Sequence, residues 1–182
     1  LRRQRQMCIR DRVYYDRKEE VIMRKIILAS ASPRRKELLE RAGVDFEVLP
    51  ASGDENRISD NPGEAVKQLA SDKAASVIRT MKDSADGTIV IGSDTVVVFE
   101  NVILGKPHDT EDAVNTLKKL QANTHQVYTG VSVWEKKEKV WTEHTFYEST
   151  DVTFYPVSDE EIREYVATGA VSYTHLTLPT KL

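Results

Sequence analysis

The fold is decided by the stretch at residues 26–35, which reads Ile26-Ile27-Leu28-Ala29-Ser30-Ala31-Ser32-Pro33-Arg34-Arg35. Its first three residues form an apolar run that is typical of a short buried strand. Ser32 is a favourable helix N-cap, and Pro33 falls at the first helical position, where its missing N–H costs nothing. Gly43 suits the position just beyond the end of that helix. The sequence therefore predicts a buried strand that runs straight into a helix at residues 33–42.

The start of this helix carries two serine hydroxyls and two arginines, contributed by Ser30, Ser32, Arg34 and Arg35. A helix start presents free N–H groups and a partial positive charge, so it attracts anions. An arginine fork can also hold phosphate oxygens through paired hydrogen bonds. These features favour a phosphate-binding turn, and the alternative is an ordinary capped helix with a solvated basic face.

The two ends of the chain have the features of translated DNA that is not part of the gene. Residues 7–11 can be encoded by DNA whose reverse complement encodes residues 171–175. Unrelated ends of a gene should not be reverse complements, so we interpret residues 1–12 and 171–182 as translated sequencing-adapter DNA. Residues 13–22 are interpreted as translated upstream DNA, with Met23 as the natural start. The expected organisation is an extension at residues 1–22, one domain at residues 23–170 and a non-native tail at residues 171–182.

Charge and cysteine content limit the function of this domain. The whole chain has a formal net charge of −3, and its excluded ends are net basic, so the domain is clearly acidic. An acidic domain is a poor candidate for binding nucleic acid or an anionic membrane. Cys8, the single cysteine, lies in an excluded end, so the domain is expected to use no disulfide and to work in the cytoplasm. The sequence has no apolar run long enough to span a membrane.

A second helix is expected at residues 62–81, with Asn61 as its N-cap. Lys73 lies near the middle of its apolar face, since a helix has about 3.6 residues per turn. The ammonium group must either reach out to solvent, which is the commoner outcome, or point at a negative group such as a phosphate. The apolar face itself consists of Val66, Leu69, Ala70, Ala74 and Val77.

Residues 88–99 are the most β-prone stretch of the chain, and their apolar run predicts a strand buried on both faces. Asp94 interrupts this run, and a carboxylate there is unfavourable unless it is paired or binds a cation. Gly92 allows another group to approach the backbone closely. Asp94 is therefore the strongest physical indication of a site, and the alternative is an acid at a strand end in a hairpin.

Glu55 belongs to a polar loop at residues 51–60. Acidic side chains in such loops are usually solvated, and the alternative is that Glu55 is a metal ligand. His125 and His144 lack the spacing of metal ligands, so we interpret both as ordinary strand residues.

The remaining patterns predict further elements along the chain. They are a strand at 46–50, a turn at 100–101, a helix at 109–120, a strand at 125–134, a hairpin tip at 135–138, strands at 140–148 and 152–155, and a helix that begins with a capping box at 158–161.

The chain contains a series of short motifs: Ser30-x-Ser32-Pro33-Arg34-Arg35, Glu55, Leu69-Ala70-x-x-Lys73-Ala74, Gly92-x-Asp94-Thr95-Val96, Lys106-Pro107 and His125-x-Val127-x-Thr129. In order and spacing they resemble the Maf family of nucleoside triphosphate pyrophosphatases, over essentially all of residues 23–170. The resemblance implies an elongated α/β fold with a mixed, twisted β-sheet flanked by helices. It further implies two lobes around a cleft, as in the inosine-triphosphatase-like enzymes.

The resemblance also implies a reaction. Family members hydrolyse a nucleoside triphosphate to the monophosphate and pyrophosphate with a divalent metal, usually Mg²⁺, by attack of water on the α-phosphorus. Asp94 matches the catalytic aspartate, as proton acceptor, metal ligand or both, and Glu55 matches a second metal-binding carboxylate. Lys73 and Lys106 match lysines that offset phosphate charge. The phosphate-binding turn is matched by Ser30, Ser32, Arg34 and Arg35.

Substrate choice follows from the same resemblance. Arg34 and Thr95 match the subgroup that acts on dTTP and UTP rather than on 7-methyl-GTP. The third discriminating residue of that subgroup is a downstream glutamine, and this chain has the adapter-like tail there. We therefore expect a parent gene for a dTTP/UTP pyrophosphatase, and a chain that is truncated and weak, inactive or poorly stable as written. Family members are often dimers, which leaves a homodimer open.

Two other classes of function remain as alternatives. The family is associated with arrest of septum formation, so the domain could regulate cell division through a protein partner without catalysis. It could also bind nucleotide and metal without turnover. Substitution of Asp94 by Asn separates these hypotheses, because hydrolysis requires the carboxylate and a binding role does not.

Overall fold

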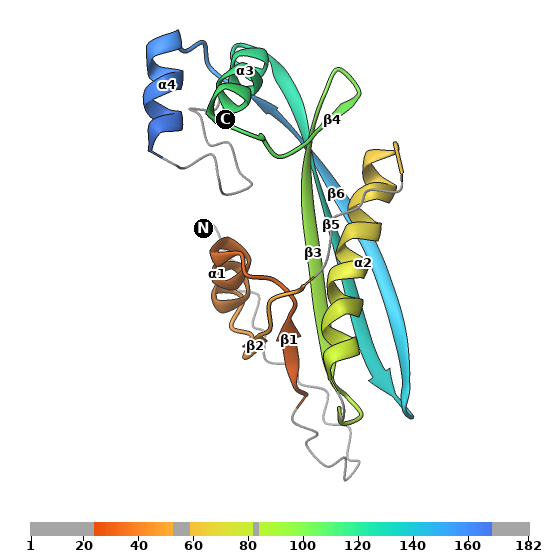
Figure 1. Cartoon of the computed structure of the whole chain (residues 1–182). Coiled ribbons are helices and arrows are strands. Elements are labelled where there is room, and N and C mark those ends of the chain that lie inside the picture. Colours follow the sequence, from red (N-terminus) through yellow and green to blue (C-terminus); the bar gives the residue numbers. More distant parts are fainter. Residues whose placement is uncertain (1–23, 53–58, 82–83, 169–182) are drawn as a thin grey trace, which may run out of the picture.

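A computed structural model describes residues 24–52, 59–81 and 84–168, which form a mixed sheet with helices on both sides (Figure 1). The sheet has six strands in the order β2-β1-β3-β5-β6, and β4 pairs with β3 outside this path. β1 runs parallel to β2 and β3, whereas β3 is antiparallel to β4 and β5, and β5 to β6. The strands are β1 (Ile26–Leu28), β2 (Glu47–Val48), β3 (Ile89–Phe99), β4 (Val102–Leu104), β5 (Thr124–Lys137) and β6 (Val140–Thr153).

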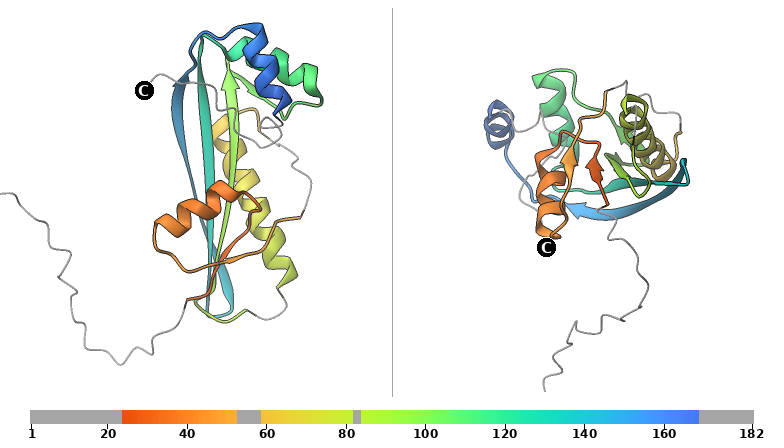
Figure 2. Two further views of the ribbon diagram at one scale, coloured as in Figure 1. Left: turned by 90° about the vertical axis from the view of Figure 1, so that its left-hand side faces the viewer. Right: turned by 90° about the horizontal axis from the view of Figure 1, so that it is seen from below.

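Four helices in the described part of the chain pack against this sheet: α1 (Pro33–Arg41), α2 (Pro62–Thr80), α3 (Thr110–Leu120) and α4 (Asp159–Ala167). α2 lies along one side of the long strands, while α1 lies on the other side near one end and α3 with α4 near the opposite end (Figures 1 and 2). The expected mixed α/β fold is therefore confirmed. The expected cleft between two lobes stays a prediction.

The predicted strand-to-helix unit is present at β1 and α1, and the helix ends as expected. Gly43 has φ +70°. Its N–H donates to the Glu40 carbonyl at 2.9 Å, and the Val44 N–H donates to the Leu39 carbonyl at 3.1 Å. This is the Schellman arrangement, which needs a left-handed residue and so favours glycine. Ser32 occupies the N-cap position as expected, although its hydroxyl makes no capping hydrogen bond.

The predicted second helix is α2, and it packs unusually close to the sheet. Asn61 caps it, with its side chain accepting the Glu64 N–H at 3.1 Å. A Cβ atom at Gly92 of β3 would lie only 2.1 Å from the Ala70 carbonyl oxygen, and one at Gly130 of β5 only 2.2 Å from that of Val66. Both glycines are therefore required by close approach of the helix backbone. The predicted apolar residues of α2 are all buried: Val66, Leu69, Ala70, Ala74 and Val77.

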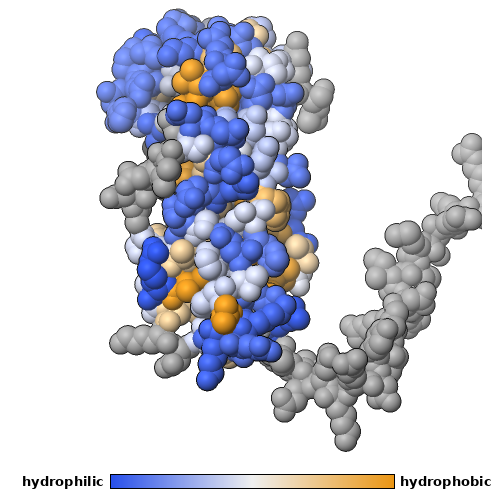
Figure 3. Space-filling view, turned by 90° about the vertical axis from the view of Figure 1, so that its right-hand side faces the viewer, coloured by the Kyte–Doolittle hydropathy of each residue, from blue (hydrophilic) through white to orange (hydrophobic). Residues whose placement is uncertain are grey.

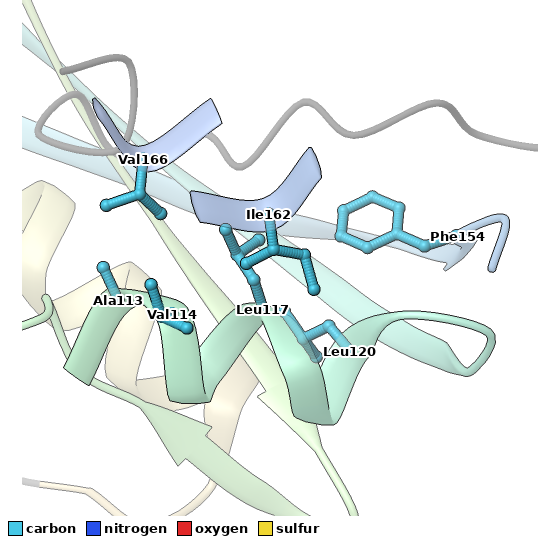
Figure 4. Packing of buried hydrophobic residues seen from close by; sticks show 7 residues of the cluster. All are labelled: Ala113, Val114, Leu117, Leu120, Phe154, Ile162 and Val166. Atoms are coloured by element: carbon cyan, nitrogen blue, oxygen red, sulfur yellow. The ribbon is translucent and has the colours of Figure 1, made fainter. Parts of the chain in front are cut away.

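Two separate apolar clusters lie against the sheet. The α2 cluster joins α2 to β1 and β3 and includes Trp134 and Trp141 at its border; its buried members are Ile27, Ala29, Ala74, Val77 and Val90. The α3–α4 cluster lies between α3, α4 and the end of β6, where its side chains point toward one another (Figure 4). Its buried members are Ala113, Val114, Leu117, Leu120, Phe154, Ile162 and Val166.

Three sequence predictions of strand boundaries are corrected by the structure. β2 covers only Glu47–Val48 of the strand expected at residues 46–50. The hairpin tip lies at Glu138 and Lys139, with φ values of 48° and 68°, rather than at residues 135–138. β6 is one continuous strand where two were expected. The capping box at Ser158 and Glu161 is confirmed as the start of α4.

One face of the molecule is mostly polar. Seen from the side of α2 and β6, hydrophilic residues predominate and apolar residues form small separate groups (Figure 3). Within residues 24–52, 59–81 and 84–168, no helix is both long and apolar enough to cross a membrane.

Candidate active site

The turn between β1 and α1 forms the first part of the site. The Ala29 N–H donates to the Ile91 carbonyl at 2.8 Å, which fixes the end of β1 against β3. The next side chain, Ser30, is buried, with 6% of its surface exposed. Its hydroxyl oxygen accepts the Ser32 N–H at 3.2 Å and Nη1 of Arg35 at 3.1 Å. The turn thus folds a guanidinium group back over the end of the strand.

Arg35 connects this turn to the central strands. Its Nη2 lies 3.5 Å from the Thr95 hydroxyl of β3, a long contact. The Thr95 hydroxyl in turn lies 3.1 Å from the Thr129 hydroxyl of β5, since these two residues are directly opposite in the sheet. A polar network therefore extends from Ser30 through Arg35 and Thr95 to Thr129. Sequence reasoning included Thr129 in a motif but gave it no role, because the pairing register that brings it to Thr95 is not visible in the sequence.

The second part of the site is an ion pair between β3 and α2. Asp94 is 8% exposed, and its carboxylate contacts the ammonium group of Lys73. The sequence left two outcomes open for the Lys73 ammonium group, exposure to solvent or contact with a negative group. The structure shows the contact with a negative group. Asp94 lies in the middle of β3, so the alternative of an acid at a strand end is wrong. The close approach at Gly92 holds α2 near enough for this contact.

The two parts face opposite sides of the sheet, because successive residues of a strand alternate. They meet at residues 92–96 of β3, which pair with β5 along one edge and leave the other edge, here called the open edge, without a partner strand among the described residues. β1 pairs with β3 only as far as Ile91, and β4 pairs only from Val97 onward. Among the described residues, no strand pairs with residues 92–96 on that edge. A ligand at this interruption could therefore contact Thr95 from one face and Asp94 from the other.

The positions of three other predicted site residues can be compared with this arrangement. Arg34 is exposed on α1, one position before Arg35. Lys106 is exposed two residues after β4, whose last residue, Leu104, pairs with Val97 at the border of the open edge. Glu55 lies outside the described residues.

The carboxylates near the open edge determine whether a divalent metal can bind there. Within the described ranges, no group of three or more His, Cys, Asp or Glu side chains could hold a metal ion. Mg²⁺ does not require such a cage, because it is usually bound by one or two carboxylates together with substrate phosphates. The buried carboxylate of Asp94, beside an open sheet edge, fits that mode of binding.

Comparison with known proteins gives consistent matches. The sequence profile of the Maf-like protein family matches residues 25–175. A dTTP/UTP pyrophosphatase of Agathobacter rectalis is 47% identical over 157 residues, covering 81% of this chain and 77% of that protein. One from Bacillus cytotoxicus is 46% identical over 147 residues, covering 80% and 73%.

A solved nucleoside-triphosphatase / dITP/XTP pyrophosphatase from Mycobacterium abscessus is also similar. It is 12% identical, with a TM-score of 0.46, and the match covers 71% of this chain and 73% of that one.

Proposed function

The chain belongs to the Maf family, and from this premise we propose that it hydrolyses dTTP and UTP to the nucleoside monophosphate and pyrophosphate. One arrangement carries the proposal. The Ser30–Arg35–Thr95 network and the Asp94–Lys73 pair flank the same open stretch of β3. The names of the relatives from Agathobacter rectalis and Bacillus cytotoxicus supply the substrate class.

Substrate binding is assigned to the β1–α1 turn and to the lysines. The guanidinium of Arg35 and the hydroxyl of Ser30 would hold phosphate oxygens, with the start of α1 adding its partial positive charge. Ser32 lies at that start, and its hydroxyl is not used for capping. Arg34 and Lys106, both exposed, would approach the phosphate chain from its solvent side. These donors would make pyrophosphate a better leaving group by balancing the charge that develops on it as its bond to the α-phosphorus breaks.

Asp94 is assigned the activation of water. Its carboxylate would accept a proton as the water oxygen bonds to the α-phosphorus and the bond to the bridging oxygen of pyrophosphate breaks. Lys73 supports this role, because its contact with the Asp94 carboxylate fixes the position of that side chain between β3 and α2. Asp94, together with Glu55, would also hold a divalent cation, proposed as Mg²⁺. Such a cation, when bound, supplies charge neutralisation and orientation of the phosphate oxygens.

The test is release of pyrophosphate from dTTP and UTP in the presence of Mg²⁺, by the full chain and by Asp94→Asn. We expect Asp94→Asn to lower kcat by at least about 100-fold, the usual range for loss of a general base. Asp72→Asn is the matched control, because Asp72 is exposed on α2 next to Lys73 and accepts a hydrogen bond from Gln68 on the same helix.

Full activity of Asp94→Asn would refute its assigned role. Absence of release both by the unsubstituted chain and by a version completed with the family's C-terminal segment would refute the proposed activity and favour the regulatory alternative, in which the domain acts on septum formation through a protein partner.

A further inference from the structure

The sheet ends at β6, which pairs with β5 along one edge and has no partner strand along the other edge among the described residues (Figure 2). This second edge is here called the outer edge. β6 is 14 residues long, whereas strands of about 5–6 residues are usual. A free strand edge presents N–H and C=O groups that can pair with another strand. The outer edge is therefore an unusually long surface for such pairing.

The outer edge lacks the features that usually prevent pairing with another chain. Those features are lysine, proline, β-bulges and covering segments. The sequence of β6, VWTEHTFYESTDVT, contains neither lysine nor proline. Its pairing with β5 continues from Val140 to Thr153 without a bulge, and most of its residues are exposed. The strand is therefore regular and accessible to a partner.

The hydrogen bonds of β5 determine which residues of β6 face the outer edge. The Lys136 N–H donates to the carbonyl of Thr88, just before β3, at 2.9 Å, so the backbone of Lys136 points toward β3. The backbone groups of successive residues in a strand point to alternate edges. Lys137 therefore bonds to its partner in β6, Val140. It follows that even-numbered residues of β6 use their backbone groups on β5, and odd-numbered residues present theirs at the outer edge.

Two copies related by a twofold axis would pair their outer edges antiparallel, and this geometry permits few registers. Opposite residues must both present their backbone groups or both point them away, so the axis must lie between the two copies of one residue. The longest overlaps place it at Phe146 or at Tyr147. With the axis at Tyr147, Glu143 would lie opposite Asp151 twice, which is unfavourable because like charges repel. With the axis at Phe146, no like charges are opposite.

We propose that the chain forms a homodimer through the outer edges of β6, with the axis at Phe146. In this register, His144 lies opposite Glu148 of the partner subunit, and Thr142 lies opposite Thr150 of the partner subunit. Phe146, which is 52% exposed, meets its own copy at the axis. Aromatic pairs, threonine pairs and pairs of opposite polarity are the cross-strand combinations that stabilise antiparallel strands. The proposal does not depend on the proposed hydrolysis.

Cross-linking through cysteine tests the register. Cys8→Ser first removes the single cysteine of the chain. In that background, Phe146→Cys places a cysteine in each copy at the axis, where the Cα atoms of a non-hydrogen-bonded pair are about 4.5 Å apart. His144→Cys is the matched control on the same face, because its two copies are four residues apart along the strands, or roughly 13 Å. That distance is too long for a disulfide, so we expect a linked dimer on a non-reducing gel from Phe146→Cys alone.

A proline at the outer edge tests the interface without altering the pairing of β6 with β5. The Thr145 N–H points to the outer edge, and Thr145→Pro removes this donor. Light scattering after size-exclusion chromatography should give the mass of two chains for the unsubstituted chain and for the control Thr145→Ala. Thr145→Pro should give the mass of one chain, with an unchanged far-UV circular dichroism spectrum that shows the fold is retained.

A charge exchange tests the pairing of His144 with Glu148. His144→Glu places like charges opposite each other at two positions and should raise the dissociation constant of the dimer by about tenfold. The double variant His144→Glu/Glu148→Lys places opposite charges there and should restore the dissociation constant. A merely misfolded His144→Glu chain would not be rescued in this way.

Three results would overturn the proposal. The first is the mass of one chain for the unsubstituted protein together with no disulfide in Phe146→Cys. The second is a dimer that Thr145→Pro leaves intact, because its interface would lie elsewhere. The third is equal cross-linking of Phe146→Cys and His144→Cys, which would exclude the register.

Discussion

The substitution Gly92→Ala tests whether the close packing of α2 on β3 determines both stability and the site. An added Cβ would lie 2.1 Å from the Ala70 carbonyl oxygen, 2.9 Å from the Ala74 nitrogen and 3.0 Å from the Ala74 Cβ. All three atoms belong to α2, and two of them are backbone atoms. No side-chain rotation can therefore relieve the contact, and the helix must move away from the strand.

The expected loss of stability can be estimated from this geometry. The contact must lengthen from 2.1 Å to the 3.4 Å at which ordinary contacts begin. Overpacking typically lowers the free energy of unfolding by about 1–3 kcal/mol. Because the contacts here are with helix backbone, which cannot rotate away, we expect a loss at the upper end, about 3 kcal/mol. For a domain of this size, that corresponds to a fall in Tm of roughly 6–12 °C. Because Lys73 moves with α2, kcat should fall as well, by as much as about 100-fold per 1 Å of misplacement.

Thermal unfolding followed by circular dichroism measures the first effect, and pyrophosphate release measures the second. Gly105→Ala is the stability control, since its Cβ meets nothing within 4 Å, and it should change the free energy of unfolding by less than about 1 kcal/mol. Gly130→Ala pushes the same helix in the same direction, so the double variant should lose less than the sum of the two single losses. A Tm for Gly92→Ala equal to that of the Gly105→Ala variant would refute the reasoning.

Three further predictions concern stability. Asn61→Ala removes the cap of α2 and should lower the unfolding free energy by about 1 kcal/mol in urea titrations; an unchanged midpoint would count against the cap. Ile162→Ala empties a fully buried position of the α3–α4 cluster and should cost about 2–5 kcal/mol, seen as a lower Tm by circular dichroism; a loss below about 1 kcal/mol would mean that the cluster collapses without cost. Burial lowers the pKa of His125, so below about pH 6.5 the unfolded chain binds a proton that the folded chain does not, and stability should fall as pH decreases. His125→Phe should make urea unfolding less dependent on pH between 7.5 and 5.5, and an unaltered dependence would contradict this assignment.

The elements that sequence reasoning located well are those whose signals are local. Asn61 with Pro62 marks a helix start by its own chemistry, as do Ser158 with Glu161, and both starts lie where they were expected. Gly43 ends α1 for a similarly local reason, because its left-handed backbone suits glycine. Asp94 also stood out locally, as a charge within a buried strand.

The features that the sequence did not reveal depend on pairing between distant segments. β6 passes through Ser149 and Asp151 without a break, because β5 supplies a partner at every position and overrides their weak strand propensity. The hairpin tip lies beyond Lys137, since the pairing of β5 with β6 continues to the end of both strands. The open edge of β3 depends on where β1 and β4 stop, and neither endpoint has a sequence signal. The roles of all the predicted site residues stay predictions, as do the homodimer and the cytoplasmic location.

The separation of the apolar residues into two clusters affects how unfolding is observed. The two tryptophans of the chain, Trp134 and Trp141, both pack against the α2 cluster. Intrinsic fluorescence therefore reports on the half of the molecule that contains α2 and β1, and it does not sense the packing of α3 on α4. Circular dichroism reports on the helices of both halves. A fluorescence transition that does not coincide with the dichroism transition would identify the two clusters as units that unfold separately.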